Sequence, residues 1–164
     1  MADSDRIQIL RINPDNSLSV ISTFGKRGNN LGEFTAPTGI AIKGDYLYVA
    51  EMGNHRIQAL RINRDGSITP KFVFGKKGND LGEFYRPYGL AVKGNYIYVT
   101  ESLNNRIQVL KIHSDGKITA KFTFGKKGRG LGRFWYPGAL AIKGNFLYVS
   151  DTANERIQIL EIRY

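Results

Sequence analysis

The chain has 164 residues, with 24 Lys and Arg against 14 Asp and Glu, a formal net charge of +10 and no cysteine. This length allows one domain with a sizeable core, and the lack of cysteine excludes a disulfide scaffold and a thiolate metal site. No apolar run approaches the ~18 residues of a membrane span, and the chain starts with acidic residues where a signal peptide carries positive charge. We therefore expect an intracellular protein, cytoplasmic or nuclear, with no membrane partner.

The sequence repeats itself at an interval of 50 residues. The triplet Arg-Ile-Gln begins at positions 6, 56, 106 and 156, and Phe-Gly begins at positions 24, 74 and 124. Phenylalanines at 34, 84 and 134 and prolines at 37, 87 and 137 keep the same register. A supersecondary unit copied at a fixed interval is the signature of a repeat architecture.

Each copy predicts four short strands. In the copy at 82–131, the apolar run 89–92 and the aromatic and β-branched run 96–100 predict strands one and two. Strand three follows at 106–113, and Asp115-Gly116 predicts a two-residue hairpin that leads into strand four at 118–124. No stretch sustains a period of 3.6 residues over two turns, so the predicted fold class is all-β.

Apolar side chains occupy both faces of the predicted strands. Tyr46 and Tyr48, for example, alternate with Leu47 and Val49. A strand of a β-sandwich exposes one of its faces to solvent, whereas a blade of a β-propeller lies between two other blades and is buried on both faces. The pattern therefore predicts a β-propeller of four-stranded antiparallel blades rather than a barrel or a solenoid.

The phase of the repeat assigns each segment to a blade. Residues 1–31 supply strands three and four of a split blade, 32–81 and 82–131 supply two whole blades, and 132–164 supply strands one to three of the split blade. Three blades' worth of strands cannot close a ring, and an open ring exposes apolar blade faces and strand edges. A fragment of a longer repeat array is the other interpretation of this shortage.

Several motifs of the repeat resemble the NHL family. They are the run Gly-x-Phe-x-x-Pro-x-Gly, the run Tyr-(Leu/Ile)-Tyr-Val-x-Glu, and the segment Asn54-His55-Arg56-Ile57-Gln58. The resemblance covers nearly the whole chain and implies a propeller, generally of six blades, that serves mostly as a binding platform for RNA or proteins. We therefore expect a homodimer that closes a six-bladed ring, in which the segments 5–12 and 155–162 compete as copies of strand three.

Residues shared by every copy are predicted to be structural. Each Arg of the Arg-Ile-Gln triplet is expected to pair with the acid that ends strand two, which is Glu51, Glu101 or Asp151. A calcium site of these three acids is the alternative interpretation, but their recurrence beside arginines favours the ion pairs. The chain has only two histidines, at non-equivalent positions, and neither a nucleophile elbow nor a complete P-loop. We predict no catalytic residues, no metal, no cofactor and no enzymatic activity.

Basic residues recur in the loop that joins strand four to the next blade, and the third loop adds aromatic residues and no acid. Cations beside exposed aromatic rings suit single-stranded nucleic acid, because phosphates attract the cations and bases stack on the rings. The sequence thus predicts a binding platform whose basic rim takes single-stranded RNA or an acidic protein, with a structural scaffold and a metal-dependent lactonase or lyase as alternatives. The predicted rim residues are Lys26, Arg27, Lys76, Lys77, Arg86, Lys126, Lys127, Arg129, Arg133, Trp135 and Tyr136.

Overall fold

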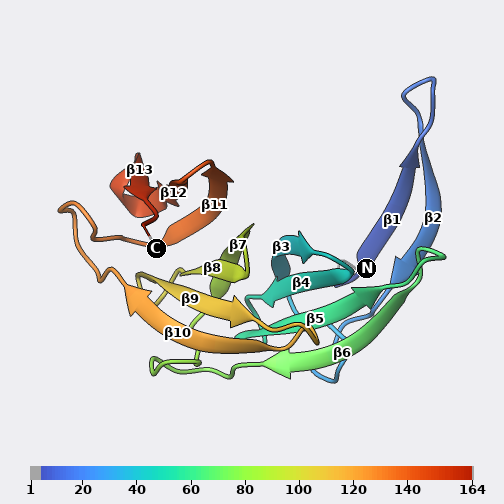
Figure 1. Ribbon diagram of the computed structural model, residues 1–164, viewed down its shortest axis with the longest axis horizontal. Helices are drawn as coiled ribbons and strands as arrows, with labels where there is room; N and C mark the ends of the chain where they lie inside the picture. The colour runs from blue at the N-terminus through green and yellow to red at the C-terminus, as the bar shows by residue number, and fades with distance from the viewer. Residues whose placement is uncertain (1–4, 164) are drawn as a thin grey trace.

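A computed structural model describes residues 5–163, which form four antiparallel sheets that follow one another along an open arc (Figure 1). The all-β propeller predicted from the sequence is confirmed. Among the described residues the one helix is the short turn η1 (Thr152–Asn154), and no helix is long and apolar enough to cross a membrane. The strands are β1 (Ile7–Ile12), β2 (Leu18–Phe24), β3 (Pro37–Lys43), β4 (Tyr46–Glu51), β5 (Arg56–Ile62), β6 (Ile68–Phe74), β7 (Pro87–Lys93), β8 (Tyr96–Glu101), β9 (Arg106–Ile112), β10 (Ile118–Phe124), β11 (Pro137–Lys143), β12 (Phe146–Asp151) and β13 (Arg156–Glu161).

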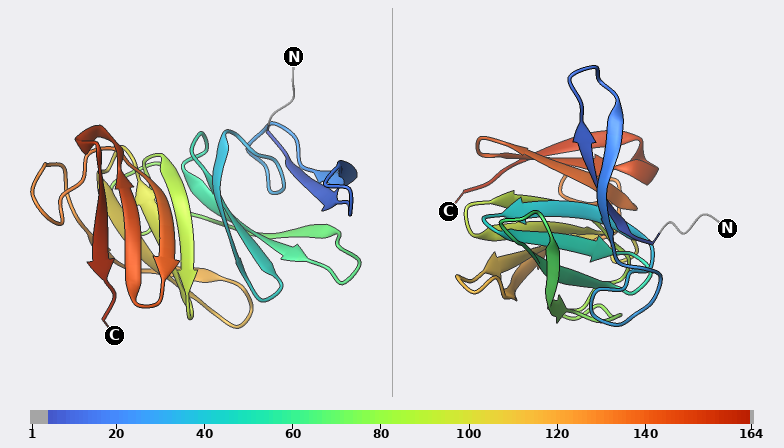
Figure 2. Two further views of the ribbon diagram at one scale, coloured as in Figure 1. Left: turned by 90° about the horizontal axis from the view of Figure 1, so that it is seen from above. Right: turned by 90° about the vertical axis from the view of Figure 1, so that its right-hand side faces the viewer.

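Two of the four sheets are complete blades. The first complete blade contains β3 to β6 and the second contains β7 to β10, each in the order of the sequence. The amino-terminal hairpin consists of β1 and β2, and the carboxy-terminal sheet of β11, β12 and β13. Both copies of strand three are therefore paired within a single chain, β1 with β2 and β13 with β12. The hairpin projects from one end of the arc (Figure 2).

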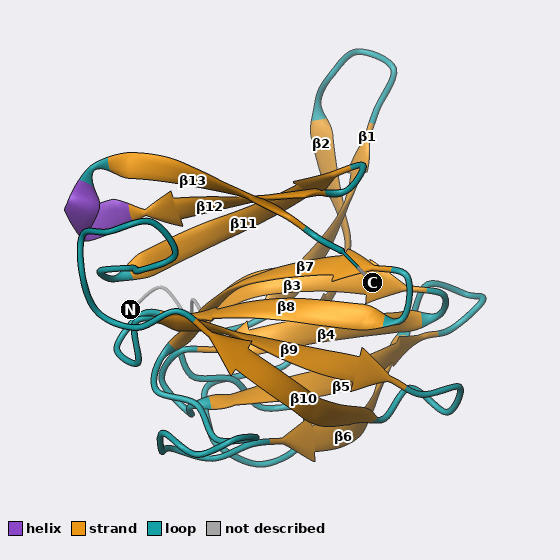
Figure 3. Cartoon of the chain, turned by 60° about the vertical axis from the view of Figure 1, so that its left-hand side comes forward, coloured by secondary structure: helices purple, strands orange, loops and turns teal. Residues whose placement is uncertain are grey.

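The innermost strands of neighbouring sheets lie directly against one another. The Thr38 hydroxyl donates a hydrogen bond to the Tyr88 carbonyl at 2.9 Å, which joins β3 to β7. A Cβ atom added at Gly89 would lie 2.7 Å from the Gly138 carbonyl oxygen, so glycine is required where β7 meets β11. These contacts hold β3, β7 and β11 side by side at the inner edge of the arc (Figure 3).

Three apolar clusters fill the spaces between the sheets. The largest joins Tyr48 and Ile57 of the first complete blade to Ile97 and Leu110 of the second. A second cluster joins the second blade to the carboxy-terminal sheet, and a third joins the amino-terminal hairpin to the first blade. Each complete blade is thus buried on both faces, which explains the apolar residues on both sides of its strands.

The hairpin loop between β9 and β10 is longer than the predicted two-residue turn. The His113 and Lys117 backbones still pair, through a hydrogen bond of 2.9 Å from the His113 N–H, so the loop contains the three residues 114–116. The Gly116 N–H then donates to the His113 carbonyl, and Gly116 has a φ of +82°. Asp115-Gly116 therefore forms the end of a type I turn and its left-handed residue, which is the usual three-residue hairpin.

Candidate functional site at the blade junctions

A buried carboxylate at the end of strand two organises each junction. Glu101 accepts hydrogen bonds from Arg106 Nε at 2.6 Å, Asn104 Nδ2 at 2.6 Å and Gln108 Nε2 at 3.0 Å. The Tyr85 backbone N–H also donates to this carboxylate, at 3.2 Å. Glu51 and Asp151 have the same partners in their own sheets, so the predicted pairing of arginine with these acids is confirmed.

Donors from four residues surround each of these carboxylates. At Asp151, burial raises the pKa, but hydrogen bonds from the Trp135 N–H and from Asn154, Arg156 and Gln158 outweigh it and lower the pKa. Among residues 5–163 no cluster of three or more His, Asp or Glu side chains is arranged to hold a metal ion. The acids that the sequence suggested as a calcium site act instead as the structural anchor of the loops.

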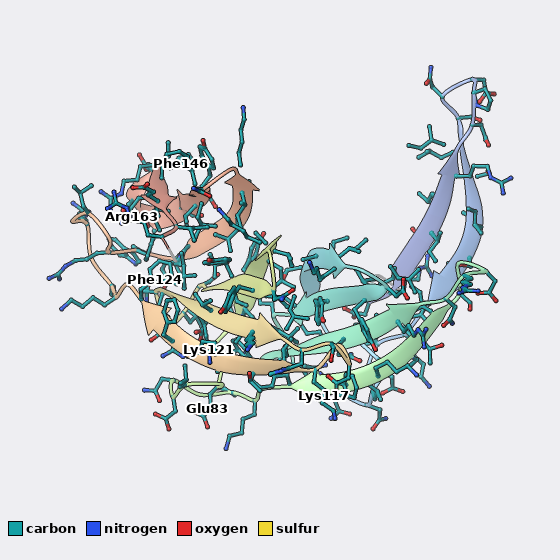
Figure 4. The ribbon with its side chains drawn as sticks, in the orientation of Figure 1. Glu83, Lys117, Lys121, Phe124, Phe146 and Arg163 are labelled. Atoms are coloured by element: carbon teal, nitrogen blue, oxygen red, sulfur yellow. The ribbon has the colours of Figure 1, made fainter. Side chains whose placement is uncertain are left out.

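Most of the predicted rim residues are exposed in the loops between the blades, while Trp135 is half-buried. Some of the cations are neutralised within their own loops. Lys26 lies 3.3 Å from a Glu33 oxygen, and Lys76 lies 3.2 Å from a Glu83 oxygen. Glu83 lies at the edge of the molecule in Figure 4. In the third loop the position of these glutamates is taken by Arg133, so the charge of this loop is wholly positive.

Other rim cations cover the aromatic rings beside them. Lys77 Nζ lies 4.9 Å from the centre of the Tyr85 ring, and Lys127 Nζ lies 5.1 Å from the centre of the Trp135 ring. Arg129 lies 5.7 Å from the same Trp135 ring. These are cation–π contacts within the protein, so cations already lie over the Tyr85 and Trp135 rings, while Tyr136 is 45% exposed.

One backbone contact recurs at every junction with a different side chain. The N–H of the residue before the inner strand donates to the last residue of the loop between strands two and three in the preceding sheet. The acceptors are Asp5 Oδ1 for the N–H of residue 36 at 2.8 Å, His55 Nδ1 for residue 86 at 3.0 Å, and Asn105 Oδ1 for residue 136 at 3.0 Å. This position must supply an acceptor, but its chemistry varies from copy to copy.

The junction between the two complete blades holds an imidazole among cations. We call the group of His55, Lys77, Tyr85 and Arg86 the His55 junction. The His55 ring meets Tyr85 edge-on at 5.3 Å between ring centres. Burial lowers the pKa of His55, and the positive charges of Lys77 and Arg86 lower it further. Because Nδ1 accepts the Arg86 N–H, the neutral ring carries its proton on Nε2.

Lys77 and Arg86 are among the residues predicted from the sequence, but His55 is not. The two histidines lie at non-equivalent positions of the repeat, which argued against a shared metal site and drew attention away from each of them. The sequence does contain a signal for His55, because this position of the repeat differs in every copy. The other copies have Asp5, Asn105 and Glu155 there. A position that varies within an otherwise repeated motif marks chemistry particular to one junction.

The fold and its repeats place this chain in the class of β-propeller proteins. The sequence model of the LVIVD repeat matches residues 37–55, 88–109 and 137–157, which begin at or next to the inner strand of the three later sheets. A search of curated proteins finds no match. The finer likeness to NHL repeats is not tested by these matches.

Solved structures share the fold at low sequence identity. A candidate 6-phosphogluconolactonase from Bacteroides uniformis is 17% identical, with a TM-score of 0.73 over 100% of this chain and 48% of its own. A second candidate 6-phosphogluconolactonase, from Bacteroides fragilis, is 16% identical, with a TM-score of 0.64 over 95% and 47%. The periplasmic gluconolactonase of Pseudomonas aeruginosa is 18% identical, with a TM-score of 0.56 over 96% and 50%. The chain therefore spans about half the length of these proteins.

These findings correct the function expected from the sequence. The prediction of a platform that binds single-stranded RNA on a basic rim was wrong, since three of the solved structures that share this fold are named as lactonases. The structure supplies the physical reason for the error, because the prediction treated the basic pairs as free charges beside open aromatic faces. Part of that charge is neutralised by Glu33 and Glu83, and part covers Tyr85 and Trp135.

Proposed function

We propose that the chain hydrolyses a sugar lactone at the His55 junction. The observation that carries this proposal is an imidazole whose pKa is lowered by burial and by two nearby cations, with its Nδ1 engaged by the backbone and its Nε2 carrying the proton. The names of the solved structures with this fold support the same reaction class. The site lies between two complete blades of one chain, so it does not depend on a second copy.

The reaction requires stabilisation of an anion more than a strong base. Water adds to the lactone carbonyl carbon, the carbonyl oxygen becomes an oxyanion, and collapse of this intermediate breaks the ring C–O bond. The products are a carboxylate, a hydroxyl group and one released proton. The Nε2–H of His55 donates to the oxyanion, and the charges of Lys77 and Arg86 stabilise both the oxyanion and the carboxylate. The same two cations attract a phosphorylated lactone, which is an anion before it reacts.

Two finer assignments belong to this proposal. The first is the likeness of the repeat to the NHL family, and the second is an intracellular setting, which the lack of cysteine suggested. Both stay predictions. No observation tests the prediction that the chain lacks enzymatic activity, and the following experiment does.

The test measures acid release from glucono-δ-lactone and from its 6-phosphate at constant pH, above the spontaneous rate. We expect the protein to accelerate both and His55→Asp to reduce kcat about 100-fold, the usual effect of losing one oxyanion donor. Aspartate keeps the acceptor for the Arg86 N–H, as Asp5 does for its own junction, but removes the Nε2–H donor.

The matched control is Asn105→Asp at the next junction, which makes the same kind of change beside Tyr136. We expect this variant to retain the activity of the unmodified chain. A protein that does not exceed the spontaneous rate, or equal losses in the two variants, would contradict the proposal.

A further inference from the structure

An apolar groove lies between the second complete blade and the carboxy-terminal sheet. Its volume is about 510 Å³, and β10 forms one wall, with Phe124 and Lys121 below Arg163 in Figure 4. Phe122 is 53% exposed at this wall. We call this space the apolar groove, and its main apolar lining is Tyr96, Tyr98, Phe122, Phe124, Leu160 and Ile162.

The preceding junction shows which element normally occupies this place. There the equivalent wall, 50 residues earlier, is covered by the start of β10. Tyr48 donates to the Gly116 carbonyl at 2.9 Å, Lys117 lies over the Phe72 ring at 5.5 Å, and Ile118 is only 7% exposed. Strand four of one sheet therefore covers the face of the sheet before it. The carboxy-terminal sheet consists of strands one to three, and the space that a strand four would fill is the apolar groove.

The amino-terminal hairpin carries the segment that matches this space. Asn16 and Leu18 stand 100 residues before Gly116 and Ile118, and Asn16 has a φ of +63° where Gly116 has +82°. Leu18 is 63% exposed, whereas Ile118 is 7% exposed. The hairpin thus presents the surface of a strand four at one end of the arc, and the carboxy-terminal sheet, which borders the groove, lies at the other end (Figure 1).

We infer that the apolar groove binds the amino-terminal hairpin of a second copy of this chain, with Leu18 entering as Ile118 does at the internal junction. The arrangement is reciprocal, so a twofold dimer fills both grooves and closes a ring of six blades. The partner is a second copy because the internal junction already shows how the same repeated residues fit together. This inference does not rest on the proposed lactonase activity.

Docking also requires an exchange of strand three. The incoming hairpin contains β1 as well as β2, so β1 takes the place of β13 beside β12. The segments 6–12 and 156–162 differ only at Arg11 and Glu161. Arg6 and Gln8 are exposed in the single chain, and in the dimer they replace Arg156 and Gln158 at the Asp151 carboxylate. Because β1 bonds to β12 with the same side chains that β13 uses, the burial of apolar surface remains as the driving force of the exchange.

Light scattering on variants tests this inference. The unmodified chain is expected to have twice its 18.4 kDa mass, and Leu18→Asp and Phe122→Asp are each expected to have the mass of one chain. Both side chains are more than half exposed in the single chain, so neither change removes a buried side chain there, and circular dichroism checks the fold. Leu81→Asp is the control, since Leu81 is 54% exposed and lies beside Thr119 and Ala120 at the junction within the chain, and it is expected to stay dimeric. Dimers of the groove or hairpin variants, or an unmodified chain that stays single at all concentrations, would overturn the inference.

Discussion

At the scale of single residues, the junctions combine a fixed anchor with a variable acceptor. Arg, Gln and Asn side chains surround each buried carboxylate in the same way, while the acceptor at positions 5, 55 and 105 changes from aspartate to histidine to asparagine. The fixed set explains why the loops keep one conformation. The variable position explains how a repeated fold provides one of these three junctions with an imidazole.

The histidine makes stability depend on pH in a defined direction. The pKa of His55 in the folded chain lies below the value of 6.5 that applies to the unfolded chain. Between these two values the unfolded state binds more protons, so the free energy of unfolding falls as the pH drops below about 6.5. Urea unfolding at about pH 7 and at about pH 5.5 measures this loss.

The matched variant for this measurement is His55→Asn. Asparagine provides the same acceptor that Asn105 provides for the Tyr136 N–H, but it does not titrate. We expect the variant to lose less stability between the two pH values than the unmodified chain does. An equal loss in both proteins would assign the pH dependence to other groups.

The sequence predicted the ion pairs between the arginines and the buried carboxylates, but not the pairs between the rim lysines and Glu33 or Glu83. The Arg–acid pairs follow from adjacency in a hairpin, because Arg56 and Glu51 face each other on paired strands. The contact of Lys76 with Glu83 depends on the fold of the whole loop, in which the Phe84 N–H bonds back to the Lys76 carbonyl. No strand pattern specifies that turn, so the partner of the lysine could not be predicted.

At the scale of elements, hairpin turns hold neighbouring blades together. The loop before β10 reaches across to the first complete blade, where Tyr48 donates to Gly116. The equivalent loop before β6 has no such neighbour at Gly66, because a Cβ atom there would meet nothing within 4 Å. The same turn therefore has a packing role in one copy and none in the other.

This difference gives a matched pair of substitutions, Gly116→Ala and Gly66→Ala. They are compared in the Leu18→Asp chain, which is expected to stay single, because closing the ring would place Gly66 against a second copy. Both glycines have a φ near +80°, so both changes introduce the same backbone strain. Only at position 116 does the new Cβ collide with a ring, that of Tyr46. We expect Gly116→Ala to lower the free energy of unfolding by about 1 kcal/mol more than Gly66→Ala. Urea unfolding measures both, and equal losses would show that the turn does not hold the blades together.

At the scale of the whole molecule, the four sheets form an arc. The apolar groove lies at its carboxy-terminal end, and the amino-terminal hairpin, whose strand four has no blade to cover, lies at the other end. The repeat interval and the two-sided apolar strands were enough to predict the propeller, because each copy must bury both faces against its neighbours. They did not show the groove, which depends on how far the β9–β10 turn reaches over the blade before it. The interval makes Leu18 the counterpart of Ile118, but only the structure shows that Ile118 is buried while Leu18 is exposed.

The mass of the unmodified chain in solution tests the central claim most directly, because both ends of the arc must find a partner. Sedimentation equilibrium over a range of concentrations gives this mass without a standard or a variant. Closure by a second copy predicts a single species of twice 18.4 kDa, with dissociation only on dilution. A mass of 18.4 kDa at every concentration, or a series of growing oligomers, would contradict a closed ring of two chains.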